Sequence, residues 1–431
     1  MSNDIDIAAR HAAYVLLHGS LRAQRSIDED FEKHVGGLEP RDRAFVRLLV
    51  ATTLRRLGQI DEVLASFVNR APPERVTDLL RLGTAQLLFL GTPAYAAVGT
   101  TVALTKRGNT PQAGMVNAVL RRVSEKGADM IAAQDAAKLN TPAWLWTSWV
   151  AAYGEPAARA TAEAHLVEPA LDLSLKNPAD MNAWAQRLEA TPLPTGSLRR
   201  AGGGRITDLA GFAEGAWWVQ DAAAALPAKI LLHALGGGTE KTAIDLCAAP
   251  GGKTAQLVAA GCAVTAVDAV ADRLSLLNEN LKRLNLAAQV VRADARTWRP
   301  VSLVDGVLLD APCTATGTIR RHPDLPHLKH LTDPARFAVL QTELLTAAAY
   351  MVKPGGYVLY SVCSLQPEER KAVVAAAIEK GAPLVAVKIP TEAVGGESQF
   401  LTSAGELRTL PSQWPERAGL DGFYGALLQR I

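Results

Sequence analysis

Two of the four cysteines in this chain follow short apolar runs of the kind that form buried strands. Cys313 comes after the run Val307-Leu308-Leu309, and Cys363 comes after Tyr357-Val358-Leu359. Because doubly wound sheets bind their ligands at the carboxyl ends of parallel strands, thiols in these places can meet a substrate. The alternative is burial as small apolar side chains, which is the commonest fate of a free cysteine. Taken together, the two positions predict thiol chemistry.

A glycine-rich turn upstream of both cysteines predicts a cofactor site. The run Asp245-Leu246-Cys247-Ala248-Ala249-Pro250-Gly251-Gly252-Lys253-Thr254 follows a strand candidate and opens a helix. Gly251 and Gly252 allow the backbone to approach a ligand closely, and the N–H groups at the helix start favour a carboxylate or a phosphate. The spacing fits neither the phosphate loop, whose first glycine would have to replace Cys247, nor the dinucleotide fingerprint.

Three acids follow one another along the predicted sheet. Asp245, Asp268 and Asp294 each end one of three successive strand candidates. Asp268 has the position, about twenty residues beyond the turn, from which an acid accepts hydrogen bonds from ribose hydroxyls. Asp294 is placed to meet an adenine amine. Each acid alone fits a helix cap or a solvated turn, but the ordered set predicts a cofactor that carries a nucleoside.

The pattern of the whole chain predicts several domains. Its 431 residues, 48% hydrophobic and 20% charged, are typical of a folded chain of two or three domains. Apolar residues recur every three or four positions up to about Val123, which predicts helices, and strands alternate with helices from about Ala222 onward. We therefore predict an all-α domain over 1–135, a small α+β module over 136–221 and an α/β Rossmann-like domain over 222–431.

The smaller elements follow from the same patterns. Alternation over Leu171–Leu175 predicts a strand, Met181–Leu188 fits a helix, and the glycines and arginines of Leu198–Arg205 predict a flexible basic loop. The segment Trp217-Trp218-Val219-Gln220-Asp221 is expected to help wall the cleft of the next domain. Six strands are predicted in that domain: Ala243–Leu246, Ala263–Val267, Gln289–Arg292, Gly306–Leu309, Tyr357–Tyr360 and Gly422–Leu428.

The charge of the chain leaves its partners open. A net charge of +2 neither requires nor excludes a nucleic-acid partner, because steering depends on where charge clusters. Arginines on the predicted helices form either solvated faces with ion pairs or a phosphate-binding surface. These arginines are Arg41, Arg43, Arg47, Arg55, Arg56, Arg121 and Arg122.

The cysteines and the N-terminus predict a compartment. Four cysteines in 431 residues and no basic-apolar leader indicate a reducing environment, so we expect a cytoplasmic protein. No stretch approaches the roughly 18 apolar residues that a membrane crossing needs. No two cysteines have the spacing of zinc ligands, so no metal is expected.

The motifs of the predicted Rossmann-like domain resemble those of S-adenosylmethionine-dependent RNA cytosine-5 methyltransferases. The resemblance rests on the turn Asp245–Lys253, on Asp310-Ala311-Pro312-Cys313 with Arg320-Arg321-His322-Pro323-Asp324, and on Tyr360-Ser361-Val362-Cys363-Ser364 with Pro367-Glu368-Glu369. These segments match in the order and spacing of that class.

The first domain resembles the antitermination factor NusB. The similar segments are Leu80-Arg81-Leu82-Gly83, Pro93-Ala94-Tyr95-Ala96-Ala97-Val98 and Gly114-Met115-Val116-Asn117-Ala118-Val119-Leu120-Arg121-Arg122. A NusB-like domain fused to such a catalytic domain is the architecture of the Fmu/Sun family, the small-subunit (16S) ribosomal RNA cytosine-5 methyltransferases. The resemblance covers nearly the whole chain.

The chemistry of cytosine agrees with this resemblance, because C5 cannot take a methyl group unaided. A thiolate that adds to C6 makes C5 the equivalent of a carbanion. The resemblance implies that Cys363 is the nucleophile and that Cys313 assists elimination and product release. It also implies that Asp310 stabilises the changing charge of the ring at N3 or the exocyclic amine. The family usually has Thr where Val362 stands here, so a hydroxyl there is dispensable or is supplied by Ser361.

The implied cofactor is S-adenosyl-L-methionine, with S-adenosyl-L-homocysteine as its product. Lys253 pairs either with Asp310 or with the cofactor carboxylate. The residues expected to bind the cofactor are Cys247, Ala248, Ala249, Pro250, Gly251, Gly252, Lys253, Asp268, Arg273, Asp294 and Asp310.

The implied partner is small-subunit ribosomal RNA, and we expect a monomer. Pro312, Arg320, Arg321 and His322 are expected to bind the substrate, the basic residues through phosphates, unless they pair with acids such as Asp324. The target base must be flipped out or single-stranded, because stacking hides C6.

Two alternatives remain open at this point. A transfer-RNA cytosine-5 methyltransferase is the alternative of the same class, because catalytic motifs do not name the RNA. A non-catalytic RNA-binding or antitermination protein is the alternative of another class. The presence of both Cys313 and Cys363 argues against the latter, whereas fold alone would not.

Overall fold

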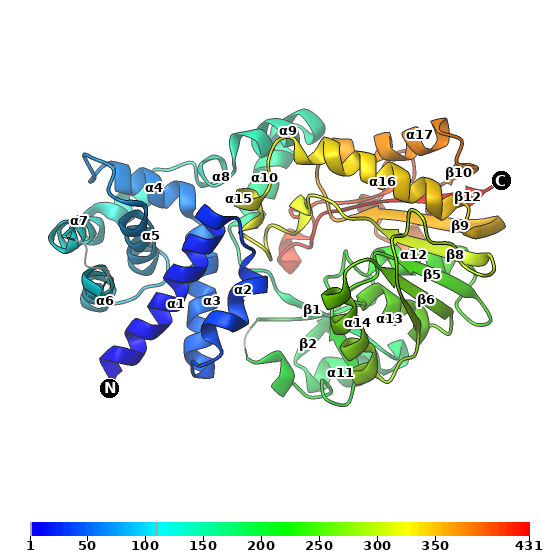
Figure 1. Ribbon diagram of the computed structural model, residues 1–431, viewed down its shortest axis with the longest axis horizontal. Coiled ribbons are helices and arrows are strands. Elements are labelled where there is room, and N and C mark those ends of the chain that lie inside the picture. The colour runs from blue at the N-terminus through cyan, green and yellow to red at the C-terminus, as the bar shows by residue number, and fades with distance from the viewer. Residues whose placement is uncertain (1, 108–110, 203) are drawn as a thin grey trace. The chain divides into compact units, whose positions relative to one another are not determined.

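The computed structural model describes residues 2–107, 111–202 and 204–431, and it divides into two compact units (Figure 1). The helical unit comprises the chain up to Val167 together with Ile319–Leu331, and the sheet unit comprises Glu168–Thr318 and Thr332–Ile431. Residues 136–167 therefore pack with the N-terminal helices, and residues 168–221 pack with the large sheet. The division into three domains at positions 135 and 221 stays a prediction.

The helical unit is built from amphipathic helices around one apolar core. Buried Leu17, Leu49, Leu80 and Leu120, each at most 1% exposed, come from four different helices and meet in that core. The turn residues Gly36-Gly37, Ala71-Pro72-Pro73 and Gly91-Thr92-Pro93 separate successive helices. The helices are α1 Ser2–Ala23, α2 Ile27–Val35, α3 Pro40–Arg55, α4 Leu57–Ala65, α5 Glu74–Leu88, α6 Ala94–Arg107, α7 Ala113–Ala132, α8 Ala136–Leu139, α9 Ala143–Tyr153, α10 Glu155–His165 and α15 Leu325–Leu328.

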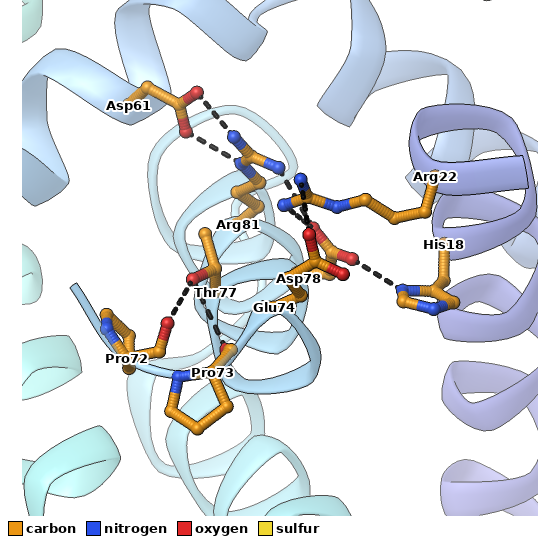
Figure 2. A network of polar contacts seen from close by, with 9 residues as sticks. All are labelled: His18, Arg22, Asp61, Pro72, Pro73, Glu74, Thr77, Asp78 and Arg81. Carbon is orange, nitrogen blue, oxygen red and sulfur yellow. Dashed lines mark hydrogen bonds and ion pairs between the residues drawn. The ribbon is translucent and has the colours of Figure 1, made fainter.

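A buried carboxylate ties three of these helices together (Figure 2). Asp78 on α5 is completely buried and lies 2.8 Å from His18 and 3.6 Å from Arg22, both on α1. It also accepts a hydrogen bond of 2.9 Å from Arg81, whose guanidinium binds Asp61 of α4 with two further bonds. A buried charge is stable only when it is paired in this way.

The helix α2 receives its N-terminal cap from a residue almost three hundred positions away. Its own N-cap residue, Ser26, makes no side-chain capping bond. The Ile27 N–H instead donates to Asp324 Oδ2 at 3.0 Å, and Asp324 is 3% exposed. His322 Nδ1 lies 2.9 Å from Asp28 Oδ2 on the same helix. These contacts explain why Ile319–Leu331 belongs to the helical unit.

Two of the arginines predicted to lie on positive helix faces form ion pairs in the structure. Arg43 pairs with Glu32 and Arg47 with Asp28, so these two form the predicted solvated faces with ion pairs. Arg121 is exposed on α7. A phosphate-binding surface on these helices stays a prediction.

The sheet unit begins with a small antiparallel sheet. Its strand order is β2-β3-β1-β4, and the predicted strand Leu171–Leu175 is β1. The prediction of a flexible loop over Leu198–Arg205 is wrong at its start, because Leu198–Arg200 pairs with β1 as β3; Gly203 lies outside the described residues. The elements of this part are β1 Leu171–Leu175, α11 Met181–Arg187, β2 Ala190–Pro192, β3 Leu198–Arg200 and β4 Trp217–Val219.

The large sheet is the Rossmann-like core that the sequence predicted. Its strand order is β10-β12-β9-β8-β5-β6-β7, with β11 paired to β12. The five strands from β9 to β7 are parallel, whereas β12 runs antiparallel to β9 and pairs antiparallel with both β10 and β11. The strands are β5 Thr242–Leu246, β6 Ala263–Asp268, β7 Gln289–Arg292, β8 Val304–Asp310, β9 Val352–Val362, β10 Leu384–Val387, β11 Leu407–Thr409 and β12 Phe423–Arg430.

Helices cover both faces of this sheet (Figure 1). Alternate strand residues point to opposite faces, so Ile244 of β5 packs with α16 and α17, whereas its neighbour Ala243 packs with α12. A parallel sheet covered in this way exposes only its strand ends. The helices are α12 Leu226–Ala234, α13 Gly252–Ala259, α14 Ala271–Leu284, α16 Asp333–Ala349 and α17 Lys371–Glu379.

All six predicted strands of this domain are present, and two further strands were missed. β10 and β11 have only four and three residues and lie on the antiparallel side of the sheet. Such short edge strands carry too few residues for a periodic pattern. In the described part of the chain, no helix is long and apolar enough to cross a membrane.

Candidate active site

The glycine-rich turn joins β5 to α13 through residues with left-handed backbone. Cys247 has a φ of 59° and Gly251 a φ of 101°. The second value explains the glycine, because a side chain at that φ is strained. The turn is held to the next strand, since Ala248 N donates to Val267 O at 3.1 Å. This hydrogen bond therefore helps to fix the backbone conformation at the predicted cofactor site.

A cavity of about 200 Å³ opens beside this turn. Predicted cofactor residues that line it are Ala248, Ala249, Pro250, Gly252, Lys253 and Asp310. Val219 and Gln220 also line the cavity, which confirms that the segment Trp217–Asp221 helps to wall the cleft. The remaining predicted cofactor residues, Cys247, Gly251, Asp268, Arg273 and Asp294, are not among the residues that line the cavity.

Asp268 and Arg273 brace the turn in this structure. Asp268 accepts hydrogen bonds from Ala249 N at 3.2 Å and Val270 N at 3.1 Å. Arg273 donates to Ala249 O at 2.6 Å and lies 3.7 Å from Asp268. Asp294 binds Arg296 at the end of β7, and the hydrogen bonds of this arginine lower the pKa of Asp294.

Asp245 is a cavity residue that the sequence analysis did not include among the cofactor ligands. It is completely buried, and its Oδ2 accepts a hydrogen bond of 2.6 Å from Thr254. Its Oδ1 has no hydrogen-bond partner among the described residues. Burial raises the pKa of Asp245 to about 7. An unpartnered buried acceptor in a cavity wall suits a cationic ligand group. The available signal was its position at the end of β5.

The two predicted cysteines meet at the ends of neighbouring strands. β8 and β9 are parallel, with Asp310 opposite Ser361, so the segments that follow them lie side by side. Cys313 Sγ and Cys363 Sγ are 3.5 Å apart, and both thiols are free. Neither side chain is fully buried, which argues against a purely structural role.

An ion pair lies at the same strand ends. Lys253 Nζ donates to Asp310 Oδ2 at 2.6 Å, and Ser361 Oγ donates to Asp310 Oδ1 at 3.2 Å. Burial opposes the charge of Lys253, but Asp310 and the nearby Cys363 raise its pKa above the ordinary value. The lysine is therefore a cation that faces both the carboxylate and the nucleophile candidate.

The predicted substrate residues separate in the structure. Pro312 lies next to the thiols, and its carbonyl accepts a hydrogen bond of 2.9 Å from Gln341. Arg320, Arg321 and His322 belong to the helical unit instead. Arg320 is 2% exposed, so its side chain is not available to a phosphate in this conformation. The alternative of ion pairing holds for His322, although its partner is Asp28 rather than Asp324.

Sequence analysis assigned no role to Glu369, which the structure connects to both loops that carry the cysteines. It is completely buried and accepts hydrogen bonds from Thr314 and Ser364, the residues that follow the two cysteines. No group of three His, Cys, Asp or Glu that could hold a metal ion occurs among residues 2–107, 111–202 and 204–431.

Comparison with known proteins finds two family models that match parts of this chain. The model of the 16S rRNA methyltransferase RsmB/F family matches residues 233–429, and the NusB family model matches residues 8–125. Two similar proteins are named ribosomal RNA small subunit methyltransferase B. The one from Vibrio cholerae is 36% identical over 80% of this chain and 82% of its own. The one from Pseudomonas putida is 32% identical over 99% of this chain and 98% of its own.

Solved structures share the fold. The crystal structure of PH0851 is 22% identical and superposes with a TM-score of 0.77, covering 99% of both chains. A methyltransferase homolog protein from Pyrococcus horikoshii is 23% identical with a TM-score of 0.53 and covers 66% of this chain and 94% of its own.

Proposed function

The chain belongs to the family of ribosomal RNA small subunit methyltransferase B, and on that premise we propose that it methylates C5 of one cytosine in small-subunit ribosomal RNA through a covalent bond from Cys363 to C6. The observation that carries this proposal is the pair of free thiols 3.5 Å apart, at the strand ends that also hold the ion pair of Lys253 and Asp310. A thiol pair at this place supplies one nucleophile and one assisting group.

Cys363 is the proposed nucleophile. Its thiolate adds to C6 of the cytosine, and the pair of electrons displaced from the C5–C6 double bond makes C5 nucleophilic. After methylation, loss of the C5 proton and departure of Cys363 restore the double bond. Cys313 assists this departure, because its sulfur lies within hydrogen-bond distance of Cys363 Sγ.

Asp310 and Lys253 supply the electrostatic part of the mechanism. Asp310 binds the cytosine at N3 or the exocyclic amine, where charge changes as the thiolate adds. Lys253 holds this carboxylate at 2.6 Å, and its positive charge stabilises a negative charge on Cys363. Ser361 fixes the second carboxylate oxygen, which leaves no need for a hydroxyl at Val362.

The cavity beside the turn suits S-adenosylmethionine. The unpartnered Asp245 Oδ1 matches the ammonium group of the cofactor, and α13 begins at Gly252 in the cavity wall, where the N–H groups of a helix start favour a carboxylate. Asp268 and Asp294 are the proposed ligands of the ribose and the adenine. When bound, the cofactor would supply the electrophilic methyl group.

Membership of the same family also supports proposals for the RNA contacts, the oligomeric state and the compartment. Arg321 and His322 are proposed to bind RNA phosphates from their partly exposed positions, and Arg320, which is buried, only after its segment rearranges. The protein is proposed to act as a monomer, since one chain supplies both thiols. Free cysteines fit the reducing cytoplasm.

Bisulfite sequencing of ribosomal and transfer RNA tests this function. Cells that lack the protein are compared with cells that carry the wild type, Cys363→Ala or Cys262→Ala. Cys262 is buried in the sheet unit, so Cys262→Ala is the matched control. One cytosine of small-subunit ribosomal RNA should be protected only with the wild type and the control. Protection of a transfer RNA instead would correct the substrate, and protection by Cys363→Ala would refute the covalent mechanism.

A further inference from the structure

One carboxylate connects the two loops that carry the cysteines. Glu369 lies on the short 3₁₀ helix η4, Pro367–Glu369, just after β9. Its Oε1 accepts a hydrogen bond of 2.9 Å from Thr314 N, and its Oε2 accepts bonds from the hydroxyls of Thr314 and Ser364. Because Thr314 follows Cys313 and Ser364 follows Cys363, the position of Glu369 bears on the distance between the thiols.

The helix α16 contributes a further side chain, Gln341, to the hydrogen bonds around Glu369. Gln341 Nε2 donates to Glu369 Oε1 at 3.0 Å and to Pro312 O at 2.9 Å, so bonds hold the chain on both sides of Cys313. The hydroxyl of Tyr360 lies 3.0 Å from Gln341 Oε1 and 2.7 Å from Glu369 O. Gln341, Tyr360 and Glu369 are each completely buried, so the network has little freedom to shift.

The hydrogen-bond donors around Glu369 indicate an ionised group. Two N–H donors reach Oε1 and two hydroxyls donate to Oε2, and an ionised carboxylate can accept all four bonds. Burial raises the pKa of Glu369, whereas the bonds from Ser364 and Thr314 lower it, with a net rise above the ordinary value.

The charges around the two thiols are therefore unequal. Titratable groups near the pair come from four elements: Lys253 of α13, Asp310 of β8, Tyr360 of β9 and Glu369 of η4. The hydrogen bond to Cys363, burial, and the charges of Cys363 and Glu369 raise the pKa of Cys313 well above its usual range. Lys253, in contrast, interacts with Cys363.

We propose that Glu369 is a positioning residue that holds the two cysteines at hydrogen-bond distance and keeps Cys313 a neutral thiol, whose S–H donates to the Cys363 thiolate. This proposal rests on the proposed function only in taking Cys363 as the nucleophile. When the C6–S bond breaks, its electron pair returns to Cys363 Sγ and the C5 proton passes to solvent. The Cys313 thiol keeps its proton and stabilises the departing thiolate.

Thiol alkylation tests the charge part of the proposal without RNA. Reaction of iodoacetamide with each cysteine is followed by peptide mass spectrometry from pH 6 to 10, in Glu369→Gln and in the exposed neighbour Glu368→Gln as matched control. Cys313 should react about tenfold faster at pH 8 in Glu369→Gln, which corresponds to a fall of about one pKa unit. Equal reactivity of Cys313 in both variants would overturn the charge role.

Steady-state kinetics test the positioning part. Glu369→Gln should lower kcat about tenfold and leave KM for RNA within about twofold, because the thiols do not hold the RNA in the ground state. Glu369→Asp keeps the charge but shortens the reach, so it should restore the wild-type alkylation profile and not kcat. A change confined to KM would overturn this part.

A milder variant covers the case in which Glu369→Gln does not fold. Ser364→Ala removes one donor and leaves the carboxylate, so kcat should fall while the alkylation profile of Cys313 stays unchanged. An unaltered kcat in Ser364→Ala would then overturn the positioning role. If the alkylation test fails, the assignments of the substrate and of the nucleophile are not affected. Methylation by Cys363→Ala, in contrast, would refute the proposed function itself.

Discussion

Asp245 combines complete burial with one oxygen that has no partner among the described residues. Burial raises its pKa to about 7, so the free protein holds a mixture of the neutral and ionised forms near neutral pH. A cationic ligand favours the ionised form. The affinity for the cofactor should therefore rise with pH up to about 7 and then level off, with about a tenfold loss per pH unit below that value.

Calorimetric titration with S-adenosylhomocysteine at pH 6, 7 and 8 checks this expectation. Asp245→Asn should bind weakly and without dependence on pH. The stability of the free protein depends on pH in the opposite direction to cofactor affinity. Because the pKa of Asp245 is raised in the folded state, its contribution to the free energy of unfolding is complete below the unfolded pKa of 3.8 and is lost as pH rises through about 7. Equal wild-type affinities at pH 6 and pH 8 would show that Asp245 does not meet the cation.

At the scale of elements, the loop after Cys313 depends on a close approach between two backbones. Gly317 N donates to Cys363 O at 3.0 Å, and a Cβ at Gly317 would lie 1.9 Å from Gly422 O. Gly317→Ala should therefore destabilise the fold by about 1–3 kcal/mol and reduce methylation. Thermal unfolding and methyl-transfer rates measure the two effects.

Gly99 offers the matched control for this substitution. A Cβ at Gly99 meets nothing within 4 Å, and the residue lies inside α6. Gly99→Ala should raise the stability of the helical unit slightly, by up to about 1 kcal/mol. If both variants unfolded at the wild-type temperature, the close approach at Gly317 would not be a constraint.

The cap of α2 leads to a second prediction at this scale. Asp324→Ala removes the acceptor of the Ile27 N–H and should destabilise the helical unit by about 1–2 kcal/mol. The exposed Asp129 on α7 provides the control Asp129→Ala, which should have no measurable effect. Hydrogen exchange of the α2 amides locates the change. Unchanged protection of α2 in Asp324→Ala would contradict the capping role.

The sequence predicted the central strands well because each element carries its own period. Alternation within β5 to β9 is local information, and the acids and cysteines at the strand ends follow directly from it. Asp324 shows the limit of this reasoning. Its basic neighbours in sequence were expected to bind substrate phosphates or to pair with it, whereas in the structure Asp324 caps a helix almost three hundred residues earlier. A contact between elements so far apart in the sequence produces no periodic pattern, so it could not be predicted from the chain alone.

Glu369 and Asp245 show the same limit within the candidate site. Both stand in motifs that the sequence analysis quoted, but burial and the count of hydrogen-bond partners decide what they can do. A single sequence does not contain those quantities. The pair Cys313 and Cys363 could be predicted because parallel strands bring their carboxyl ends to one edge.

At the scale of the whole molecule, the chain passes between its two units three times. It crosses at Val167, at Thr318 and at Leu331, so the segment just beyond the Cys313 loop is part of the helical unit. The match of the NusB model to residues 8–125 and of the RsmB/F model to residues 233–429 follows the same broad division.

The release role of Cys313 tests the central claim most directly. Cys313→Ala is incubated with small-subunit ribosomal RNA and S-adenosylmethionine, and the products are separated under denaturing conditions. The mechanism predicts a covalent protein–RNA adduct that accumulates in Cys313→Ala and disappears in the double variant Cys313→Ala/Cys363→Ala. Normal turnover of Cys313→Ala without any adduct, or an adduct that persists in the double variant, would contradict it.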